Sequence, residues 1–579
     1  MTEHSAPKTN ILSRIDLETA LYGLLFILAA LLRLADLDAR PLNLAEAGRA
    51  LDALRLAQGQ AASSAGSPLL LHGTAVSFFL FSANDFTARL FPALFGAAIV
   101  LLPFFWRRRL GHLGALIASI LLAFSPLTLF ASRSAGPEVF VIGSAMAFLT
   151  GIMGFADSGN PRHLYLSAAG LALLLASGPG AYFALLVFVV AGVVAYLLSR
   201  RQGFAGEIAA RLRESAPALR MSGLIFAGTA LAAGTLFGFN LQGLRGFGDT
   251  LTGWWQGFGG GAGLPWFSPA LWVAFYEPLA VVFGVIGGVR AIRDRDFWGS
   301  LLLGWAAGSL AMLMAWPVRA SGDFLLVSVP LVLLAGKSLA ALLEDVRAKW
   351  QGVQDGVFLA VFAVLSVYVY LQLAGFADVV DPTRARAFAT LAWVGAGLLI
   401  VLSVADGLMV GVAGALRNAE LGVAVVALMV TFSGAMSVAY NASGRSAELL
   451  DPAPTSPAVR QLVADAGTIS LRRLGDEREL PVTVMAAEPD ALAWYLRGFR
   501  HLDVRGDAGG AATADIVIAP EGIQPKLEGG YSGQGYDALL DYRLKPMSAR
   551  DWWRWALWRI RPTTALERVV LWVKAVSSE

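Results

Sequence analysis

The stretch AYFALLVFVVAGVVAYLL, residues 181–198, runs for eighteen positions without a charged side chain. A transmembrane helix needs about 20 mostly apolar residues to cross a hydrocarbon core about 30 Å thick. The stretch therefore predicts a helix that crosses a membrane. Leu21–Leu34, taken with its flanks, is a second apolar run of membrane-spanning length, interrupted only by Arg33.

The composition of the whole chain agrees with this. Its 579 residues are 56% hydrophobic and 15% charged, with a mean hydropathy of +0.61, whereas soluble domains carry about 25% charged residues. The absence of cysteine excludes thiol catalysis, a disulfide scaffold and cysteine-bound metal or haem sites. The formal net charge of +3 is small, so nucleic acid is not an expected partner. We expect a polytopic α-helical membrane protein.

A window of about 19 residues moved along the chain predicts about thirteen transmembrane spans. Their approximate ranges are 17–35, 88–105, 113–130, 138–155, 163–178, 180–198, 219–238, 269–289, 297–316, 322–341, 355–374, 386–404 and 420–440. With the N-terminus in the cytoplasm, loops on that side hold 18 lysines and arginines, and the short loops on the other side hold 5. Because positive charge is retained on the cytoplasmic side, we expect a multi-pass plasma (inner) membrane protein whose residues after 440 are extracytoplasmic.

Two segments on the predicted outer side are too long to be simple connectors. Residues 36–87 combine a helical pattern, LAEAGRALDALRLAQG, with the interfacial apolar stretch AVSFFLFSANDF. Residues 441–579 follow the membrane domain, 1–440, and alternate strand-like runs with the helical PDALAWYLRGF, which predicts a small α/β domain. Within it, residues 549–562 mix tryptophan with arginine, and we expect this part at the membrane interface.

No phosphate-binding loop, dinucleotide fingerprint, HExxH or GxSxG motif stands where it could act. Polar side chains at the predicted outer ends of the spans are more informative, because charge near a bilayer is costly without a partner or a task. Five places on this face hold Glu46; His72; Asp85 and Arg89; Arg133 and Glu138; and Tyr276, Glu277, Arg319 and Asp323. We interpret their convergence on one face as the sign of a site.

Several short motifs resemble the C-type integral-membrane glycosyltransferases. The chain reads RPLNLAEAGRA, LHG, NDFTARLFPALFG, RRLGHLGALIASILLAFSP and SRSAGPE, in that order, within residues 20–160. They most resemble the family 39 branch, which is protein mannosyltransferase-like, and its prokaryotic flippase-associated relatives. The resemblance implies a C-type glycosyltransferase fold and transfer of a sugar from a polyprenyl-phosphate donor to an acceptor at the outer face.

The sequence departs from that family pattern at two positions. The family carries its catalytic acid in an Asp-Glu pair of the first outer loop, and here Ala45 stands in place of the Asp, followed by Glu46. A carboxylate is needed there because the acceptor hydroxyl loses its proton as the anomeric carbon is attacked. Gly136 likewise replaces an arginine of the family pattern, while Arg133 remains.

Two functional interpretations stay open. In the first, the protein is an enzyme in which Glu46 is the base, assisted by Glu138. Arg133 and Arg319 would bind the donor phosphate, because a guanidinium matches its oxygens in a bidentate way. The substrate and acceptor side would be formed by His72, Asp85, Tyr276 and Glu277.

In the second interpretation, the fold keeps its lipid-binding groove but has lost its chemistry with the Asp at position 45. The protein would then be a non-catalytic glycolipid-binding or flippase-associated protein. In both cases the expected partners are a polyprenyl-phosphate sugar and membrane lipid. The acceptor class stays open between protein, lipid and glycan. We expect no cofactor, and the spacing of the carboxylates names no metal site, although a divalent metal stays open.

Overall fold

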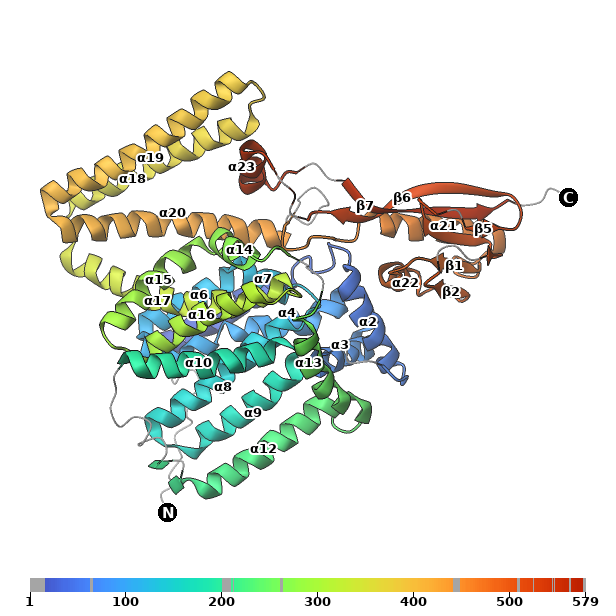
Figure 1. The fold of residues 1–579 in the computed structure, drawn as a ribbon, viewed down its shortest axis with the longest axis horizontal. Helices are drawn as coiled ribbons and strands as arrows, with labels where there is room; N and C mark the ends of the chain where they lie inside the picture. The colour runs from blue at the N-terminus through green and yellow to red at the C-terminus, as the bar shows by residue number, and fades with distance from the viewer. Residues whose placement is uncertain are drawn as a thin grey trace, which may run out of the picture.

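The computed structural model describes residues 16–62, 66–199, 210–211, 213–260, 264–440, 448–507, 511–523, 525–543, 545, 547–561 and 564–575. Long helices form a bundle that makes up most of the chain. The last part forms a separate sheet domain at one end of that bundle (Figure 1). This arrangement agrees with the polytopic helical fold and the small α/β domain predicted from the sequence.

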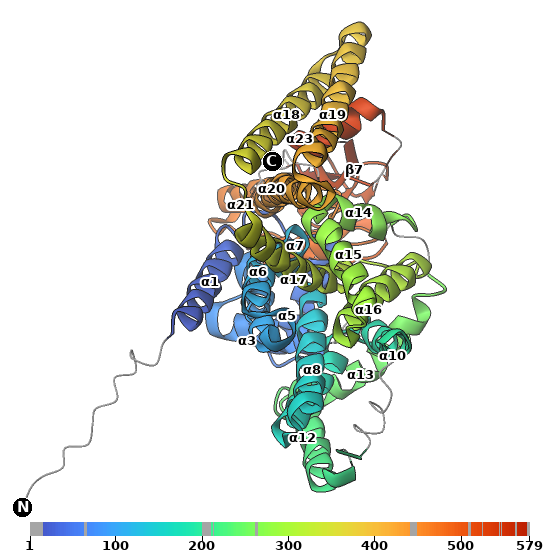
Figure 2. The ribbon, with the colours of Figure 1, turned by 90° about the vertical axis from the view of Figure 1, so that its left-hand side faces the viewer.

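The helices of the bundle follow one another with short connections. They are α1 (Leu17–Leu34), α4 (Asp85–Ile99), η2 (Leu102–Trp106), α5 (Arg107–Leu110), α6 (His112–Phe124), α7 (Pro126–Ser132), α8 (Glu138–Ser158), α9 (Pro161–Ser177), α10 (Gly180–Ser199), α12 (Ala216–Thr235), η3 (Leu241–Leu244), α13 (Arg245–Gln256), α14 (Ser268–Tyr276), α15 (Pro278–Arg293), α16 (Phe297–Ala315), η4 (Ser321–Phe324), α17 (Leu325–Lys349), α18 (Val353–Asp378), α19 (Pro382–Val410) and α20 (Val412–Tyr440). Two views at right angles agree that α12 and the α18–α19 pair lie at opposite edges of the bundle (Figure 2).

Among the described residues, ten helices are long and apolar enough to cross a membrane, or twelve if each of two bent helix pairs is one span. All thirteen ranges predicted from hydropathy fall on a helix or on a bent pair. The thirteenth predicted span corresponds to α9. This helix has 17 residues and is therefore shorter than the ten helices counted. The chain is a multi-pass membrane protein.

The two bent pairs meet each other, and two buried polar side chains satisfy the broken backbone. The α6–α7 pair bends by 57° and the α14–α15 pair by 102°. Pro126 has no N–H for the Leu122 carbonyl, and this carbonyl accepts a hydrogen bond from Arg33 Nη2 at 3.2 Å instead. The Leu127 amide, in turn, donates to Glu277 Oε1 at 3.2 Å. The side chains of Arg33 and Glu277 thus replace the backbone partners that the break in the span removes.

The segment between α1 and α4 contains two further helices. They are α2 (Leu44–Ala57) and α3 (Pro68–Phe81), which correspond to the helical pattern and the apolar stretch predicted there. Asn43 caps α2 in a capping box, since its side chain accepts from the Glu46 amide and the Glu46 carboxylate accepts from the Asn43 amide. This cap fixes where α2 begins, and with it the direction of its first turn.

The C-terminal domain is a mixed sheet flanked by helices. Its elements are α21 (Ala458–Leu474), β1 (Val482–Met485), α22 (Asp490–Leu496), β2 (Leu502–Arg505), β3 (Ala511–Ala512), β4 (Ile516–Pro520), β5 (Lys526–Leu527), β6 (Tyr531–Asp541), α23 (Ala549–Trp558) and β7 (Thr564–Lys574). The strand order is β2-β1-β4-β7-β6. β1 is parallel to β2 and β4, while β7 is antiparallel to β4 and β6. The strand-like runs of the sequence are PVTVMA, HLDV, ADIVIAP and VVLWVK, and they correspond to β1, β2, β4 and β7. PDALAWYLRGF contains α22, whereas β3, β5 and β6 were not predicted.

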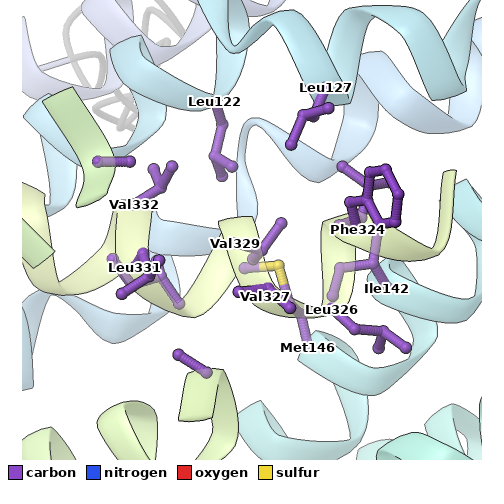
Figure 3. Close-up of a cluster of buried hydrophobic side chains, with 14 of the residues drawn as sticks. Leu122, Leu127, Ile142, Met146, Phe324, Leu326, Val327, Val329, Leu331 and Val332 are labelled. Atoms are coloured by element: carbon purple, nitrogen blue, oxygen red, sulfur yellow. The ribbon is translucent and has the colours of Figure 1, made fainter. Parts of the chain in front are cut away.

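The main core lies between α6, α7, α8 and α17. Leu122 and Leu127 meet Ile142 and Met146 beside the side chains of η4 and α17, Phe324 among them (Figure 3). This packing holds the first residues of α7, α8 and η4 at the same end of the bundle. That end carries the cavity described next.

Candidate functional site

A cavity of about 790 Å³ lies at the end of the bundle that carries the C-terminal domain. Its wall combines α2, the α7–α8 connection, the α16–η4 connection and two segments of the C-terminal domain. The charged side chains that line it are Glu46, Arg49, Glu138, Arg319, Asp451, Arg543 and Lys545. The structure therefore brings Glu46, Glu138 and Arg319, three of the residues predicted from the sequence, to one cavity.

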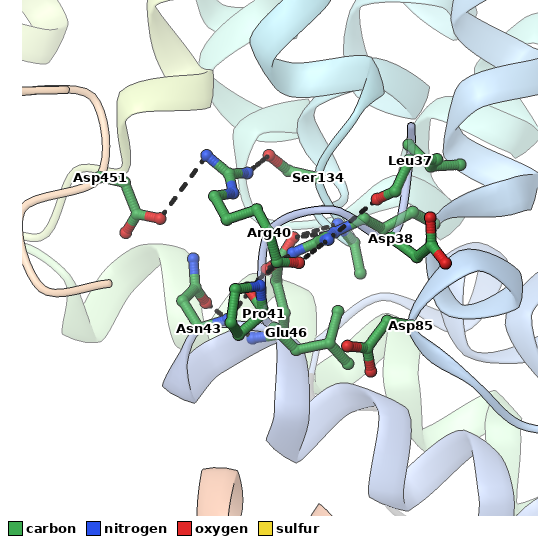
Figure 4. Close-up of polar contacts among 12 residues, drawn as sticks. Leu37, Asp38, Arg40, Pro41, Asn43, Glu46, Asp85, Ser134 and Asp451 are labelled. Atoms are coloured by element: carbon green, nitrogen blue, oxygen red, sulfur yellow. Dashed lines mark hydrogen bonds and ion pairs between the residues drawn. The ribbon is translucent and has the colours of Figure 1, made fainter. Parts of the chain in front are cut away.

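The Glu46 carboxylate is buried, at 2% exposure, and fully engaged. Arg89 donates to both oxygens, from Nε to Oε1 at 3.1 Å and from Nη2 to Oε2 at 2.6 Å. The Asn43 amide donates to Oε2 at 3.0 Å, and the Ala135 amide donates to Oε1 at 2.8 Å. Four donors occupy the roughly four lone-pair sites of a carboxylate. Figure 4 shows this cluster around Glu46.

The neighbouring charge also changes how readily Glu46 binds a proton. Burial by itself raises the pKa of this carboxyl group, but the Arg89 guanidinium outweighs burial and lowers the pKa from 4.5 to about 2. A carboxylate with so low a pKa is a weak base, because proton transfer is most efficient when the pKa lies near the working pH. The prediction that Glu46 is the catalytic base stays a prediction, and its contacts favour an organising task.

Ala45 has the opposite environment to its neighbour. Its side chain is exposed and lines the cavity, whereas Glu46 turns about 100° around the helix axis towards Arg89. A side chain at position 45 therefore points into the cavity, and one at position 46 points into the protein. A carboxylate at position 46 does not replace one at position 45 in space.

Glu138 is the carboxylate of the cavity that has no partner. No described residue forms a hydrogen bond or an ion pair with it, although it is half-buried at the first turn of α8. Its carboxyl group packs over Gly322, where an added Cβ would lie 2.9 Å from Glu138 Cδ. Asp323 follows directly, close enough for the two carboxylates to repel each other.

The cations of the cavity come from both sides of its wall. Arg49, on α2, donates to the Ala135 carbonyl at 3.0 Å from Nη1. Arg319 donates to the carbonyls of Leu313, Trp316 and Leu264, so part of its guanidinium caps the end of α16. Arg543 and Lys545, from the C-terminal domain, both pair with Asp541.

Arg133, the second predicted phosphate ligand, does not line this cavity. It lines a smaller neighbouring one of about 70 Å³. Its Nη1 donates to the carbonyls of Leu32, Arg33 and Ala35 at 2.7–3.1 Å, and its Nη2 donates to that of Asp36 at 3.1 Å. These are the carbonyls at the C-terminal end of α1, which a helix leaves without partners. Arg133 therefore caps α1.

The remaining predicted residues also make contacts outside the cavity wall. His72 Nδ1 lies 2.7 Å from the Ala233 carbonyl and Nε2 lies 3.1 Å from Asn240 Nδ2, so these partners indicate a neutral ring protonated at Nδ1. Tyr276 donates to Glu448 Oε2 at 2.6 Å. The Glu277 carboxyl group accepts hydrogen bonds from the Leu127 amide and the Ser125 hydroxyl at the break between α6 and α7. The prediction of a substrate role for these three residues is not tested by such contacts.

Asp85 contacts the C-terminal domain. It accepts hydrogen bonds from Arg460 and Tyr495 at 2.7 Å and from Trp494 at 2.8 Å. The Trp/Arg segment predicted at the membrane interface also packs on the bundle. Trp555 of α23 is buried and stacks on Phe275 with ring centroids 4.7 Å apart.

Several residues of the site had no signal in the sequence. Arg49, Asp451, Arg543 and Lys545 reach the cavity from segments far apart in the chain. Arg40, which pairs with Asp451 at 3.7 Å and donates to Ser134 (Figure 4), lines the small cavity. No periodicity or spacing within one segment reports such contacts. Across the part of the chain that the structure describes, no group of three His, Asp or Glu side chains could hold a metal ion.

Comparison with solved structures identifies the architecture. ArnT from Cupriavidus metallidurans bound to undecaprenyl phosphate matches 97% of this chain and 99% of its own, with a TM-score of 0.56 and 16% sequence identity. The apo form of ArnT matches 84% of this chain and 86% of its own, with a TM-score of 0.54 and 16% identity. The chain has the C-type glycosyltransferase fold. No protein-family model and no curated protein sequence matches it.

The C-type fold accounts for nearly the whole chain, the C-terminal domain included, because the match to ArnT extends over 97% of it. The fold expected from the short motifs is thus confirmed. At 16% identity the likeness concerns the fold. The chemistry has to be argued from the cavity.

Proposed function

We propose that this protein transfers a sugar from a polyprenyl-phosphate donor to an acceptor at the outer face of the membrane. The C-type fold supports a membrane glycosyltransferase, and the ArnT structure that matches almost end to end holds undecaprenyl phosphate. The observation that carries the proposal in this chain is the Glu138 carboxylate. It has no partner among the described residues and lines the same cavity as Arg49 and Arg319.

Glu138 is our candidate for the base. The acceptor hydroxyl gives its proton to the Glu138 carboxylate while its oxygen forms the bond to the anomeric carbon of the sugar. The bond between that carbon and the phosphate oxygen breaks, and polyprenyl phosphate leaves with the electron pair. Arg49 and Arg319 stabilise the phosphate, since charge-assisted hydrogen bonds from guanidinium groups favour it. This differs from the sequence-based hypothesis, in which Glu46 was the base and Glu138 assisted.

Glu46 has a supporting task in this proposal. Its carboxylate accepts from the Ala135 amide at 2.8 Å, three residues before Glu138. It also belongs to the first turn of α2, the helix that carries Arg49. The hydrogen bond to Ala135 and the position of Glu46 on α2 link the two sides of the site. The Glu46–Arg89 pair thereby fixes Glu138, the candidate base, relative to Arg49, a candidate phosphate ligand.

The orientation of the chain is part of the proposal. The C-terminal domain lies at one end of the bundle (Figure 1), and residues of this domain line the cavity. The excess of lysine and arginine in the alternate loops supports a cytoplasmic N-terminus, which makes this end extracytoplasmic. A polyprenyl-phosphate sugar in the outer leaflet would then reach the cavity from the membrane.

A non-catalytic function is favoured by one observation. Ala45 lines the cavity at the position where the resemblance expects a catalytic Asp. A protein with an intact cavity and no base would bind the glycolipid and release it unchanged. This makes a glycolipid-binding or flippase-associated role the second candidate.

Turnover of labelled donors separates the two. Purified protein in liposomes is given a panel of radiolabelled polyprenyl-phosphate sugars, and sugar transferred or released is measured for wild type, Glu138→Gln, Glu46→Gln and Ala45→Asp. Glu521→Gln is the matched control, because this carboxylate pairs with Arg568 on the C-terminal domain. Binding of undecaprenyl phosphate is measured in the same preparations.

Turnover by wild type and Glu521→Gln that is lost in Glu138→Gln would support the enzyme with Glu138 as base. Equal turnover by Glu138→Gln would contradict that assignment. Loss in Glu46→Gln with unchanged stability would return the role to Glu46. If wild type binds undecaprenyl phosphate without turnover and Ala45→Asp turns over, the non-catalytic function is correct.

A further inference from the structure

We propose that Asp85 is a positioning residue. Its hydrogen bonds form a contact, here called the latch, that holds the C-terminal domain against the segment from α2 to α4. This contact keeps the two walls of the cavity in a fixed position relative to each other. The inference rests on the proposed function of that cavity. It gives Asp85 a task different from the substrate contact expected from the sequence. It also makes the C-terminal domain a working part of the site.

The latch is one carboxylate with three donors from the C-terminal domain. Arg460, in the first turn of α21, donates to Asp85 Oδ2 at 2.7 Å. From α22, Trp494 Nε1 donates to Oδ1 at 2.8 Å and the Tyr495 hydroxyl donates to Oδ2 at 2.7 Å. Asp85 is buried to 9% exposure, and Trp494 is fully buried. These donors lie 375 to 410 residues away in the chain, so the contact joins two separately formed units.

Further contacts surround the carboxylate and fix its partners. The Trp494 ring stacks on Phe78 with centroids 5.7 Å apart. The Tyr495 hydroxyl also accepts from the Leu42 amide at 2.8 Å. Arg460 donates to the carbonyls of Asp38 and Ala39 as well. Each donor of Asp85 therefore touches the segment just before α2 or the helix just after it.

Capping of α4 does not explain the position of Asp85. Asn84 already caps this helix, because its side chain accepts from the Thr87 amide and the Thr87 hydroxyl accepts from the Asn84 amide. The Asp85 carboxylate is directed away from the cap, towards α21 and α22. An acid in the first turn interacts favourably with the helix dipole, but that interaction requires none of the three donors.

The latch bears on the cavity because the two sides that it joins are the two sides of the wall. α2 contributes Ala45 and Arg49, and the C-terminal domain contributes Asp451 and Lys545. α22 packs directly behind α2, where a Cβ added to Gly48 would lie 3.9 Å from the Asp490 Cβ. A shift of the domain would therefore move α2 and the opposite wall relative to each other. A misplacement of about 1 Å can cost on the order of 10²-fold in rate.

The chain offers a clean test because it has no cysteine. The double substitution Gly48→Cys/Asp490→Cys puts two thiols where the Cβ atoms lie 3.9 Å apart, within the range of disulfides. The rate of disulfide formation in the full-length protein then reports how firmly α22 sits on α2. It is measured with Asp85 retained, with Asp85→Ala, and with the control Asp381→Ala, which removes an N-terminal acid from α19.

We expect Asp85→Ala to slow disulfide formation and to lower kcat on the order of 10²-fold, with little change in KM for the donor. Asp381→Ala should change neither. Once oxidised, the Asp85→Ala protein should regain kcat, and reduction should remove it again. A merely destabilised protein would show no such reversible rescue.

Disulfide formation in Asp85→Ala as fast as in the parent would overturn the latch. A rise in donor KM without a fall in kcat would overturn it too, in favour of a substrate contact. The cross-linking measurement does not depend on turnover. A failure of the proposed function can therefore be distinguished from a failure of the latch. If the wild type is inactive but Asp85→Ala still slows cross-linking, the latch is supported and the enzymatic function is rejected.

Discussion

Glu46 and Arg89 form a closed, two-point ion pair, with Arg89 Nε 3.1 Å from Oε1 and Nη2 2.6 Å from Oε2. Both side chains are buried, at 2% and 1% exposure. Arg89 also donates to the carbonyls of Leu37, Arg40 and Pro41. The pair therefore ties α2, the start of α4 and the segment just before α2 into one unit beside the cavity.

Breaking this pair should mainly destabilise the protein. Glu46→Gln removes the charge that compensates buried Arg89, and breaking one side of a buried pair costs about 3–5 kcal/mol. Thermal unfolding in detergent measures this effect. Asp52→Asn is the matched control on α2, because its pair with Arg55 is solvent-exposed and worth less than about 1 kcal/mol. A Glu46→Gln protein as stable as the control would show that the pair is not structural.

The same pair predicts a pH dependence of stability. The pKa of Glu46 falls from 4.5 to about 2 in the folded protein, so its ionised form is favoured there by about 3 kcal/mol. This stabilisation is complete above pH 4.5 and is lost as the pH falls through 2. Wild type should lose its advantage over Glu46→Gln across that interval. Denaturant unfolding at several pH values tests this, and parallel curves for the two proteins would contradict it.

Glu277 should be needed for the order of α7 rather than for binding. Glu277→Leu leaves the Leu127 amide and the Ser125 hydroxyl without their buried acceptor, at a cost of about 1–3 kcal/mol. Glu277→Gln keeps an acceptor oxygen and should be milder. Amide hydrogen exchange of residues 127–135 measures the effect. Equal protection in wild type and Glu277→Leu would mean that the break is held by packing alone.

Arg133 and Arg49 should differ in their effect on lipid binding. Arg133→Met removes donors from the carbonyls at the end of α1 and should lower the unfolding temperature, with affinity for undecaprenyl phosphate nearly unchanged. Arg49→Met removes a cation from the cavity and should weaken that affinity by about 10- to 100-fold, as expected for a hydrogen bond to a charged group. Binding in liposomes measures both. The reverse order would support Arg133 as the phosphate ligand predicted from the sequence.

The membrane helices could be predicted from the sequence, because a helix in lipid must satisfy its backbone within itself and cover it with apolar side chains. Each such run is visible without any knowledge of its neighbours. The break at Ser125 and Pro126 also has a local cause, because Pro126 lacks the backbone N–H that a continuous helix would use. Its partners were not, since Arg33 and Glu277 belong to other helices.

The site was predicted only in part. The sequence indicated which acids and arginines lie at the ends of the spans, and three of them line the large cavity: Glu46, Glu138 and Arg319. It did not indicate which of these carboxylates has a partner. Glu46 and Arg89 are 43 positions apart in the chain, which exceeds any local spacing rule. Whether Glu138 has a partner depends on every segment of the cavity wall, and none of the described residues provides one.

The sequence by itself therefore determined the membrane class, the order of the spans, four strands of the C-terminal domain (β1, β2, β4 and β7) and the motifs of the C-type fold. These follow from local patterns of apolar and polar residues, with periods of 3.6 for helices and 2 for strands. Only the tertiary structure decided that Glu46 pairs with Arg89, that Arg133 caps α1 and that Asp85 accepts hydrogen bonds from the C-terminal domain. The chemistry of a charged group depends on the partners that reach it in space, and here these come from other helices and from the C-terminal domain.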